Sequence, residues 1–469
     1  MQRRTITILG GGFSGSMLAV QLARLPATEP YACDVHLIEP RLVPGPGLAY
    51  TARRPEYLMN VPSELLSAFP DQPDHFLNWL RVTSPEQSKQ TFCSRQSYGR
   101  YVQQLVGQVI EWPSFNGIRC HWHAQAATAV ELSADGHSAK VRLADGTEIL
   151  SDYVVLALGN FPPPSPAPAG EYLAQPTFHG NPWAQGALRN IGPDEPVLLV
   201  GSGLTAVDVL LGLQADGHRA PVTVVSRHGR WPAAHAVGGA PYPSFYATEL
   251  AGLTSVAEVL QVVRRHAREA AETGTNWRAV IDSMRPDLGR IWAAWPPKEQ
   301  ARFLRHLAGI WSVIRHRSPP KNAALVQAML TSGEVRMETG RVSRIQTDAT
   351  GLLVTVQRLG QLPRTLFTAH VVNCTGPLLD YTRIQDPAVR SLRDAGLLCP
   401  DALRLGIQTD AHGALLTNQG QASSVLFTLG PSRRPTFFES TAVPELRQQA
   451  VALAEELGQR IRATESSVV

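Results

Sequence analysis

The fold is decided near the start of the chain, by the stretch TITILGGGFSG at residues 5–15. Its apolar half predicts a β-strand, and the motif G-x-G-x-x-G follows where a helix should begin. In such a motif the first glycine permits a tight turn, the second lets a pyrophosphate approach the backbone, and the third lets helix and strand pack closely. The helix N-terminus then offers N–H groups and a favourable dipole to the phosphates. The residues expected to contact a dinucleotide here are Gly10, Gly12, Phe13, Ser14 and Gly15.

A second strand at Val35–Glu39 follows within the length of one βαβ unit. Glu39, at the end of this strand, is placed to accept hydrogen bonds from an adenosine ribose. Strand, glycine turn, helix and terminal acid together predict a Rossmann domain at the N-terminus.

The glycine motif returns in mid-chain as Gly201-x-Gly203-x-x-Ala206, again directly after an apolar strand. Alanine in the third place is an accepted variant. The next strand ends in Ser226 and Arg227 instead of an acid, and a hydroxyl with a guanidinium can hold the 2′-phosphate of NADPH. The alternative is that Arg227 stacks on the adenine or faces solvent. We therefore expect FAD at the first motif and NADPH or NADH at the second.

Two β-meanders follow the two motifs, at about 130–158 and 342–374, and each ends in an apolar strand followed by glycine. A late strand at Val425–Pro431 is expected to return to the first domain, where Gly430 and Pro431 would close over FAD; the alternative is an ordinary strand-turn-helix. The expected fold class is α/β, with two Rossmann-like domains, β-meanders and a helical insertion. The FAD-binding domain is expected at 1–165, completed by 377–469, and the NAD(P)H-binding domain at 190–376, carrying the insertion at about 245–329.

Composition excludes several classes of protein. The chain has 469 residues, a formal net charge of +4 and no basic stripe, so a nucleic-acid partner is not expected. The apolar stretches are interrupted by glycine or charge, so we expect no membrane segment and a cytoplasmic protein. Its five cysteines are far apart in the sequence, and neither they nor the histidines have metal-ligand spacing, so no metal is expected. The oligomeric state is not indicated.

Several further stretches resemble the bacterial FAD/NAD(P)-binding family that includes the FAD-dependent urate hydroxylase and the aspartate N-hydroxylase that makes nitrosuccinate. They are GPGLAY at 45–50, LMNVP at 58–62, SRQSYGRY at 94–101, GLTAVD at 203–208, SRHG at 226–229, NWR at 276–278, RHR at 315–317 and ESTAVPE at 439–445. The resemblance spans nearly the whole chain and implies that Asn60 and Arg95 lie near FAD. The residues alone instead favour a surface or helix-capping role for Arg95 and Arg100.

The absence of a redox-active cysteine pair argues against a disulfide reductase, which leaves O2 as the expected electron acceptor. Ala184 stands where the Baeyer–Villiger fingerprint requires histidine, which argues against that reaction. The first hypothesis is therefore an NAD(P)H-dependent monooxygenase acting on a small anionic substrate, with urate to 5-hydroxyisourate, a step of purine metabolism, as the most specific form. The alternatives are an amine or amino-acid N-hydroxylase and a flavin-binding redox sensor or docking protein.

Arginine and aromatic side chains suit a planar anion or a carboxylate. The candidate substrate-pocket residues are Arg278, Trp295, Arg315 and His316. The alternatives are that the tryptophans belong to a helical core and that the RHR stretch is a solvated helix end.

Overall fold

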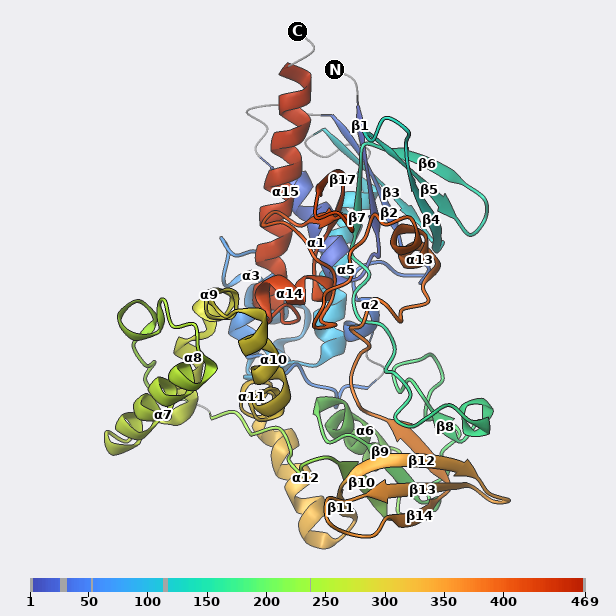
Figure 1. Cartoon of the computed structure of the whole chain (residues 1–469), viewed down its shortest axis with the longest axis vertical. Helices are drawn as coiled ribbons and strands as arrows, with labels where there is room; N and C mark the ends of the chain where they lie inside the picture. Colours follow the sequence, from blue (N-terminus) through green and yellow to red (C-terminus); the bar gives the residue numbers. More distant parts are fainter. Residues whose placement is uncertain (1–2, 26–31, 52–53, 113–116, 237, 467–469) are drawn as a thin grey trace.

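The computed structural model describes residues 3–25, 32–51, 54–112, 117–236 and 238–466. Figure 1 shows two sheets at opposite ends of the long axis, a helical layer along one side, and both chain ends at the same pole. This arrangement confirms the predicted fold class, two Rossmann-like units with β-meanders and additional helices.

The first sheet has six strands in the order β16-β17-β7-β1-β2-β3. All neighbouring pairs are parallel except the hairpin of β16 and β17, so a strand from the C-terminal part of the chain lies in the N-terminal sheet. The strands are β1 (Arg4–Leu9), β2 (Cys33–Ile38), β3 (Ile118–His123), β7 (Tyr153–Leu156), β16 (Ala414–Leu416) and β17 (Ala422–Thr428).

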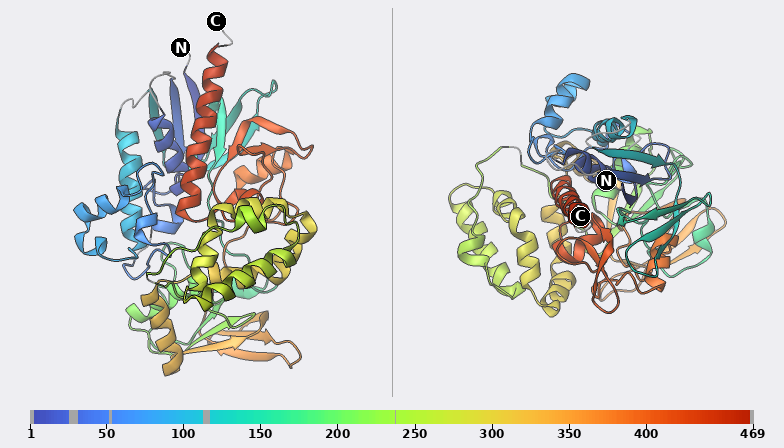
Figure 2. Two further views of the ribbon diagram at one scale, coloured as in Figure 1. Left: turned by 90° about the vertical axis from the view of Figure 1, so that its left-hand side faces the viewer. Right: turned by 90° about the horizontal axis from the view of Figure 1, so that it is seen from above.

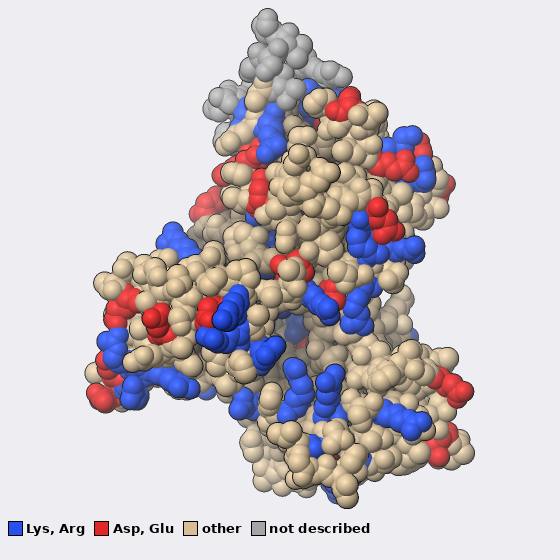
Figure 3. Space-filling view, in the orientation of Figure 1, with Lys and Arg blue, Asp and Glu red and all other residues tan. Residues whose placement is uncertain are grey.

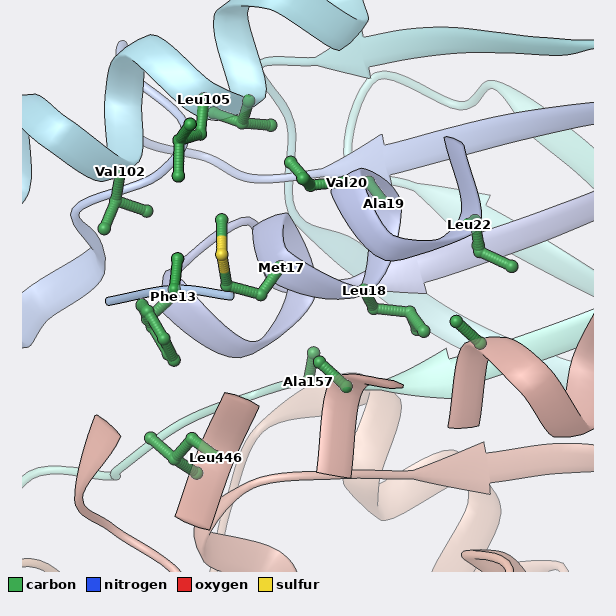
Figure 4. Close-up of a cluster of buried hydrophobic side chains, with 14 of the residues drawn as sticks. Phe13, Met17, Leu18, Ala19, Val20, Leu22, Val102, Leu105, Ala157 and Leu446 are labelled. Atoms are coloured by element: carbon green, nitrogen blue, oxygen red, sulfur yellow. The ribbon is translucent and has the colours of Figure 1, made fainter. Parts of the chain in front are cut away.

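Helices cover one face of the first sheet, and a meander with a short helix covers the other. On the first face, Met17 and Leu18 of α1 pack among Val102 and Leu105 of α5 and Leu446 of α15 (Figure 4). The opposite face packs against the meander and α13. These elements are α1 (Phe13–Arg24), α5 (Arg95–Glu111), α13 (Pro387–Asp394), α15 (Val443–Ser466), β4 (Ala127–Leu132), β5 (Ala139–Leu143) and β6 (Glu148–Ser151).

The second sheet is entirely parallel, in the order β11-β10-β9-β15-β8. Its apolar strands are buried between α6 and α12 on one face and the second meander on the other, as expected for a parallel sheet. The elements are β8 (Phe178–His179), β9 (Val197–Val200), β10 (Val222–Ser226), β11 (Val335–Thr339), β15 (His370–Asn373), α6 (Leu204–Ala215), α12 (Pro320–Ser332), β12 (Arg341–Thr347), β13 (Leu352–Gln357) and β14 (Arg364–Thr368).

The helical layer projects to one side of the molecule, at the level between the two sheets (Figure 2). It consists of a π-helix at Tyr246–Leu250 and of α7 (Val256–Glu272), α8 (Trp277–Ser283), α9 (Leu288–Ala294), α10 (Pro297–His306) and α11 (Ala308–Arg315). These helices share one core, in which Trp292 stacks on Phe438 of the C-terminal region at 4.7 Å. The stretch expected as an insertion, about 245–329, also contains most of α12, which packs in the core of the second sheet. The domain bounds stay predictions.

Shorter helices complete the chain. They are α2 (Gly47–Tyr50), α3 (His75–Thr83), α4 (Pro85–Ser88) and α14 (Arg434–Phe437), with 3₁₀ turns at Ser63–Leu65, Glu171–Ala174, Arg285–Asp287 and Pro431–Arg433. Among the described helices, none is both long and apolar enough to cross a membrane.

Candidate functional site

A cavity of about 980 Å³ lies between the two sheets, where the carboxyl ends of their parallel strands face each other. Open α/β sheets bind ligands at this edge. The cavity is lined by most of the residues predicted to bind cofactors, namely Gly10, Gly12, Phe13, Ser14, Glu39, Asn60, Arg95, Gly201, Gly203, Ser226, Arg227 and Pro431. Most of the predicted residues of both glycine motifs therefore line one continuous cavity.

The first glycine motif has the geometry that a bound pyrophosphate requires. Gly10 has a φ of +109°, and a Cβ there would collide with the backbone of Ala157. Gly15 lies behind the cavity wall, where a Cβ would overlap the carbonyl oxygen of Gly10. Helix α1 begins at Phe13 with no acidic residue in its first turn and no side-chain cap, so its N–H groups and dipole are available to phosphate oxygens. These features fit FAD.

Glu39 lies at the end of β2 with 3% of its side chain exposed. Its Oε2 accepts a hydrogen bond from the N–H of Gly11 at 3.0 Å, and its Oε1 accepts one from the N–H of Arg41 at 3.1 Å. These bonds hold the carboxylate at the rim of the cavity. Arg41 Nη1 also donates to both of its oxygens at 3.2 Å, so ribose hydroxyls would take the place of this half-exposed guanidinium.

The second glycine motif repeats the turn of the first. Gly201 has a φ of +107°, and a Cβ there would lie 2.5 Å from the carbonyl oxygen of Cys374. A Cβ on Gly203 would meet nothing within 4 Å, so the motif faces open space. Ala206 is buried in the core behind it. Helix α6 also begins without an acidic residue in its first turn or a side-chain cap.

Exposed basic residues follow β10, the strand that comes after the second glycine motif. Ser226 Oγ accepts the N–H of Gly229 at 3.0 Å, which leaves its own O–H free to donate. Arg227 and Arg230 also line an adjoining pocket of about 440 Å³, to which α10 adds Arg305 and His306. Within the part of the chain that the structure describes, these three arginines have no carboxylate partner. Figure 3 shows Lys and Arg side chains gathered around this hollow.

The C-terminal region forms another wall of the cavity. Pro431 lines the cavity, and Gly430 packs behind it against Ser14, with its N–H bonded to Gln449 Oε1 at 2.8 Å. Residues Thr441, Ala442, Val443 and Leu446, at the start of α15, extend this largely apolar wall.

Asn60 and Arg95 lie at the junction of the two domains. The carbonyl oxygen of Asn60 accepts a hydrogen bond from His235 Nε2 at 2.9 Å, and burial lowers the pKa of His235 to about 4. Arg95 donates from Nη2 to Asp208 Oδ2 at 2.9 Å. Asp208 was not predicted as a site residue, although it ends the GLTAVD stretch.

The structure separates the four candidate substrate residues. His316 lines the cavity, whereas Trp295 is a core residue of the helical layer, 5.4 Å from Phe303. Arg278 donates to the carbonyl oxygen of Ala234 and lies outside the cavity lining.

Arg315 is buried behind the cavity wall, and its Nη2 lies 3.6 Å from Glu445 Oε1. Its Nε and Nη2 atoms make no hydrogen bond within the described part of the chain. Burial lowers the pKa of Arg315. Arg315 therefore lies within a buried group of charges, and it is not placed to touch a ligand directly.

Glu439 contacts two residues at this wall of the cavity, Trp311 and His316. The sequence did not indicate it as a site residue. Its Oε1 accepts the indole N–H of Trp311 at 2.8 Å, and its Oε2 lies 3.3 Å from His316 Nε2. Burial opposes the ionisation of Glu439, yet the hydrogen bond and charge of His316 and the charge of Arg315 hold its pKa below the usual range. The arrangement fixes the His316 imidazole at the cavity wall.

Comparison with known proteins supports an FAD/NAD(P)-binding fold. Residues 7–161 match the FAD-NAD(P)-binding family, so this part of the chain is an FAD/NAD(P)-binding domain. The chain is 27% identical over 247 residues to the L-aspartate N-monooxygenase (nitrosuccinate-forming) of Streptomyces cremeus. That match covers 44% of this chain and only 37% of the relative.

Two solved structures show the same fold over 98% of this chain. The ornithine N-hydroxylase of Kutzneria sp. 744, with reduced FAD, NADP⁺ and L-ornithine, has a TM-score of 0.66 at 14% identity, and all of that chain is covered. The L-lysine 6-monooxygenase of Pseudomonas syringae has a TM-score of 0.62 at 18% identity, with 99% of that chain covered. The chain therefore has the fold of the two-dinucleotide-binding flavoproteins. The resemblance to the aspartate N-hydroxylase is supported, whereas that to the urate hydroxylase is not.

Proposed function

We propose that this chain is an FAD-dependent monooxygenase that consumes NADPH and O2 to N-hydroxylate a small amine or amino acid. The observation that carries the proposal is the single cavity between the two sheets, which brings both glycine motifs to one space. A flavin and a nicotinamide bound there would meet, as hydride transfer requires. The balanced reaction is R–NH₂ + O₂ + NADPH + H⁺ → R–NHOH + NADP⁺ + H₂O.

One set of residues would bind FAD and another would bind the coenzyme. The first motif, Glu39, Asn60 and Pro431 would hold FAD, and the second motif with Ser226 and Arg227 would hold the coenzyme. When bound, FAD supplies electron transfer from the coenzyme to O2 and the activation of O2. The apolar wall at the start of α15 excludes water from the reacting centre.

The exposed basic residues favour NADPH over NADH. The 2′-phosphate is a dianion that prefers several charge-assisted hydrogen bonds. The free hydroxyl of Ser226 and the guanidiniums of Arg227, Arg230 and Arg305 offer such bonds on two sides of one pocket.

The relatives favour amine N-hydroxylation over the urate hydroxylation predicted first. Their names give aspartate, ornithine and lysine as substrates, all of which carry a primary amine and a carboxylate. The arginines at the edge of the cavity, Arg227, Arg230 and Arg305, suit such a carboxylate. His316, held by Glu439, is the candidate residue nearest to a bound substrate, because it is the one of the four that lines the cavity.

The test is a product assay on the full chain loaded with FAD. NADPH oxidation is followed with L-aspartate, L-ornithine, L-lysine, cadaverine and urate, and products are identified by mass spectrometry. We expect an amine to stimulate NADPH oxidation and to yield its hydroxylamine or nitroso product. Formation of 5-hydroxyisourate from urate would overturn the proposal in favour of urate hydroxylation. A reduced flavin that persists in air with every compound would overturn it in favour of a redox sensor or docking protein.

A further inference from the structure

One face of α6 is devoted to contacts between the two nucleotide-binding domains. Asp208, Gly212 and Asp216 follow each other at intervals of four residues, so they lie in a row along one side of the helix. We call these three residues the α6 contact row. Each of them meets a residue of the first domain that lies more than a hundred positions away in the sequence.

The first contact is a buried ion pair. Asp208 is 3% exposed, and its Oδ2 accepts a hydrogen bond from Arg95 Nη2 at 2.9 Å. The same guanidinium donates from Nε to the carbonyl oxygen of Leu58 at 3.3 Å and lies 5.5 Å from the ring of Trp183. Arg95 therefore has one fixed orientation, held from both domains and from the connector between them.

The other two contacts extend the row. A Cβ on Gly212 would lie 2.5 Å from the hydroxyl of Tyr57, so any larger residue would force Tyr57 or α6 to move. Asp216, at the end of α6, forms an ion pair with Arg54. The row thus holds α6 at three successive turns against Arg95, Tyr57 and Arg54 of the first domain.

A buried carboxylate is an unfavourable choice for stability alone. Burial raises the pKa of Asp208 to about 6, and Arg95 opposes that rise. Tyr57 and Cys374 also face this carboxylate, and neither supplies a positive charge. Buried ion pairs add little net stability compared with apolar packing, but they can specify one arrangement among several.

The start of α6 belongs to the cavity wall. Gly203 and Leu204 line the cavity, and Asp208 lies one turn further along the same helix. Any rotation of α6 against the first domain would therefore move the second glycine motif relative to the first. Displacements of about 1 Å between reacting groups are enough to slow a reaction by about 100-fold.

We propose that the α6 contact row fixes the orientation of the coenzyme domain relative to the flavin domain and so sets the approach of the nicotinamide to the flavin. Asp208, Arg95 and Gly212 are positioning residues in this inference, which rests on the proposed function. Their effect on the reaction is exerted through the position of α6.

The experiment compares two variants of the row with two matched controls, all as full chains loaded with FAD. Asp208→Asn is matched by Asp194→Asn, which removes one partner of an exposed ion pair with Arg219 inside the second domain. Gly212→Ala is matched by Gly107→Ala in α5, where a new Cβ would meet only the tip of Glu111 at 3.9 Å. Flavin content and Tm establish that every variant is folded.

Two measurements are made. Anaerobic stopped-flow absorbance gives the limiting rate of flavin reduction by NADPH and the Kd for NADPH, and small-angle X-ray scattering gives the radius of gyration. We expect both row variants to lower the limiting rate by about ten-fold or more, with a Kd within about two-fold of wild type. We also expect Gly212→Ala to enlarge the radius of gyration, while both controls match the wild type.

The proposal is overturned if both row variants reduce flavin as fast as their controls, or if their slower reduction is explained by a weaker Kd alone. A wild-type protein that NADPH does not reduce would count against the proposed function and not against the contact row. In that case the scattering decides, because an unchanged radius of gyration in Gly212→Ala contradicts a role in fixing the domains.

Discussion

The two glycine motifs share one local geometry and differ in everything around it. The first glycine of each has a φ near +108°, at +109° for Gly10 and +107° for Gly201. Each of these glycines approaches the backbone that follows a neighbouring parallel strand, at Ala157 and at Cys374. The turn is therefore set by local sequence, and the difference in function must come from the surroundings.

The first motif is enclosed and the second is open. A Cβ on Gly12 would lie 3.3 Å from Gly47, whereas one on Gly203 would meet nothing within 4 Å. The buried Glu39 directly follows β2, the strand after the first motif. The exposed Arg227 directly follows β10, the strand after the second motif. An enclosed site suits a cofactor that stays bound, and an open one suits a coenzyme that leaves after each turnover.

The largest expected effect on cofactor binding is at the helix–strand contact of the first motif. Gly15→Ala places a Cβ against the carbonyl oxygen of Gly10, so α1 must move away from β1. We expect FAD affinity to fall by about 100-fold, close to 3 kcal/mol, because overpacking of this kind disturbs the backbone. The bound flavin is measured by its visible absorbance after gel filtration.

The matched change in the open motif is Gly203→Ala. It adds a Cβ in free space, so we expect unchanged FAD content and a weaker affinity for NADPH alone. Equal loss of FAD in both variants would mean that the two motifs are not separate sites.

The two helices that follow the motifs provide the next comparison. Met17 in α1 and Asp208 in α6 occupy the same position relative to their glycines, and both are buried. Met17→Ala should lower the free energy of unfolding by about 2–5 kcal/mol at every pH, because only apolar packing is lost.

Asp208 should instead make stability depend on pH. Its pKa is raised from 3.8 to about 6 in the folded chain, so its contribution is fully present below about pH 4 and is lost as pH rises through about 6. The loss is on the order of 3 kcal/mol, and Asp208→Asn should abolish it. Urea unfolding of both proteins between about pH 4 and about 7.5 measures the change, and parallel profiles would contradict it.

A smaller effect is expected at the end of β10. Arg227→Ala should raise the KM for NADPH by about 10–100-fold and leave that for NADH nearly unchanged, because a charge-assisted bond to the 2′-phosphate is lost. Arg219→Ala, on the surface of the same domain, is the control. Equal effects on both coenzymes would show that Arg227 contacts another part of the molecule.

The smallest effect is expected at Glu39. Glu39→Gln keeps the size of the side chain but weakens its bond to the N–H of Gly11 and the bonds proposed with ribose, so FAD affinity should fall by about ten-fold. Fluorescence titration of the apoprotein with FAD measures the change. An unchanged Kd would remove Glu39 from the FAD site.

Sequence patterns predicted the motifs well because each is a local device in which strand, turn and helix lie within one short stretch. They could not reveal the pairing of Arg95 with Asp208, because these residues are 113 positions apart and meet only when both domains are folded. The periodicity of the helical layer also did not distinguish Trp295, which lies in its core, from a residue that lines the cavity. Helical spacing identifies a buried face without saying what covers it.

The role of Glu439 was missed for a related reason. Its partners lie more than a hundred residues earlier, Trp311 on α11 and His316 directly after it. The stretch ESTAVPE marks a resemblance without assigning a contact. The motifs could not indicate the substrate either, because both of them are patterns for binding dinucleotides.

The contrast between an enclosed and an open motif is tested most directly by passing the protein, saturated with FAD and NADP⁺, through a desalting column. We expect FAD to stay with the protein in stoichiometric amount while NADP⁺ is lost. Loss of FAD together with NADP⁺, or retention of both, would contradict it.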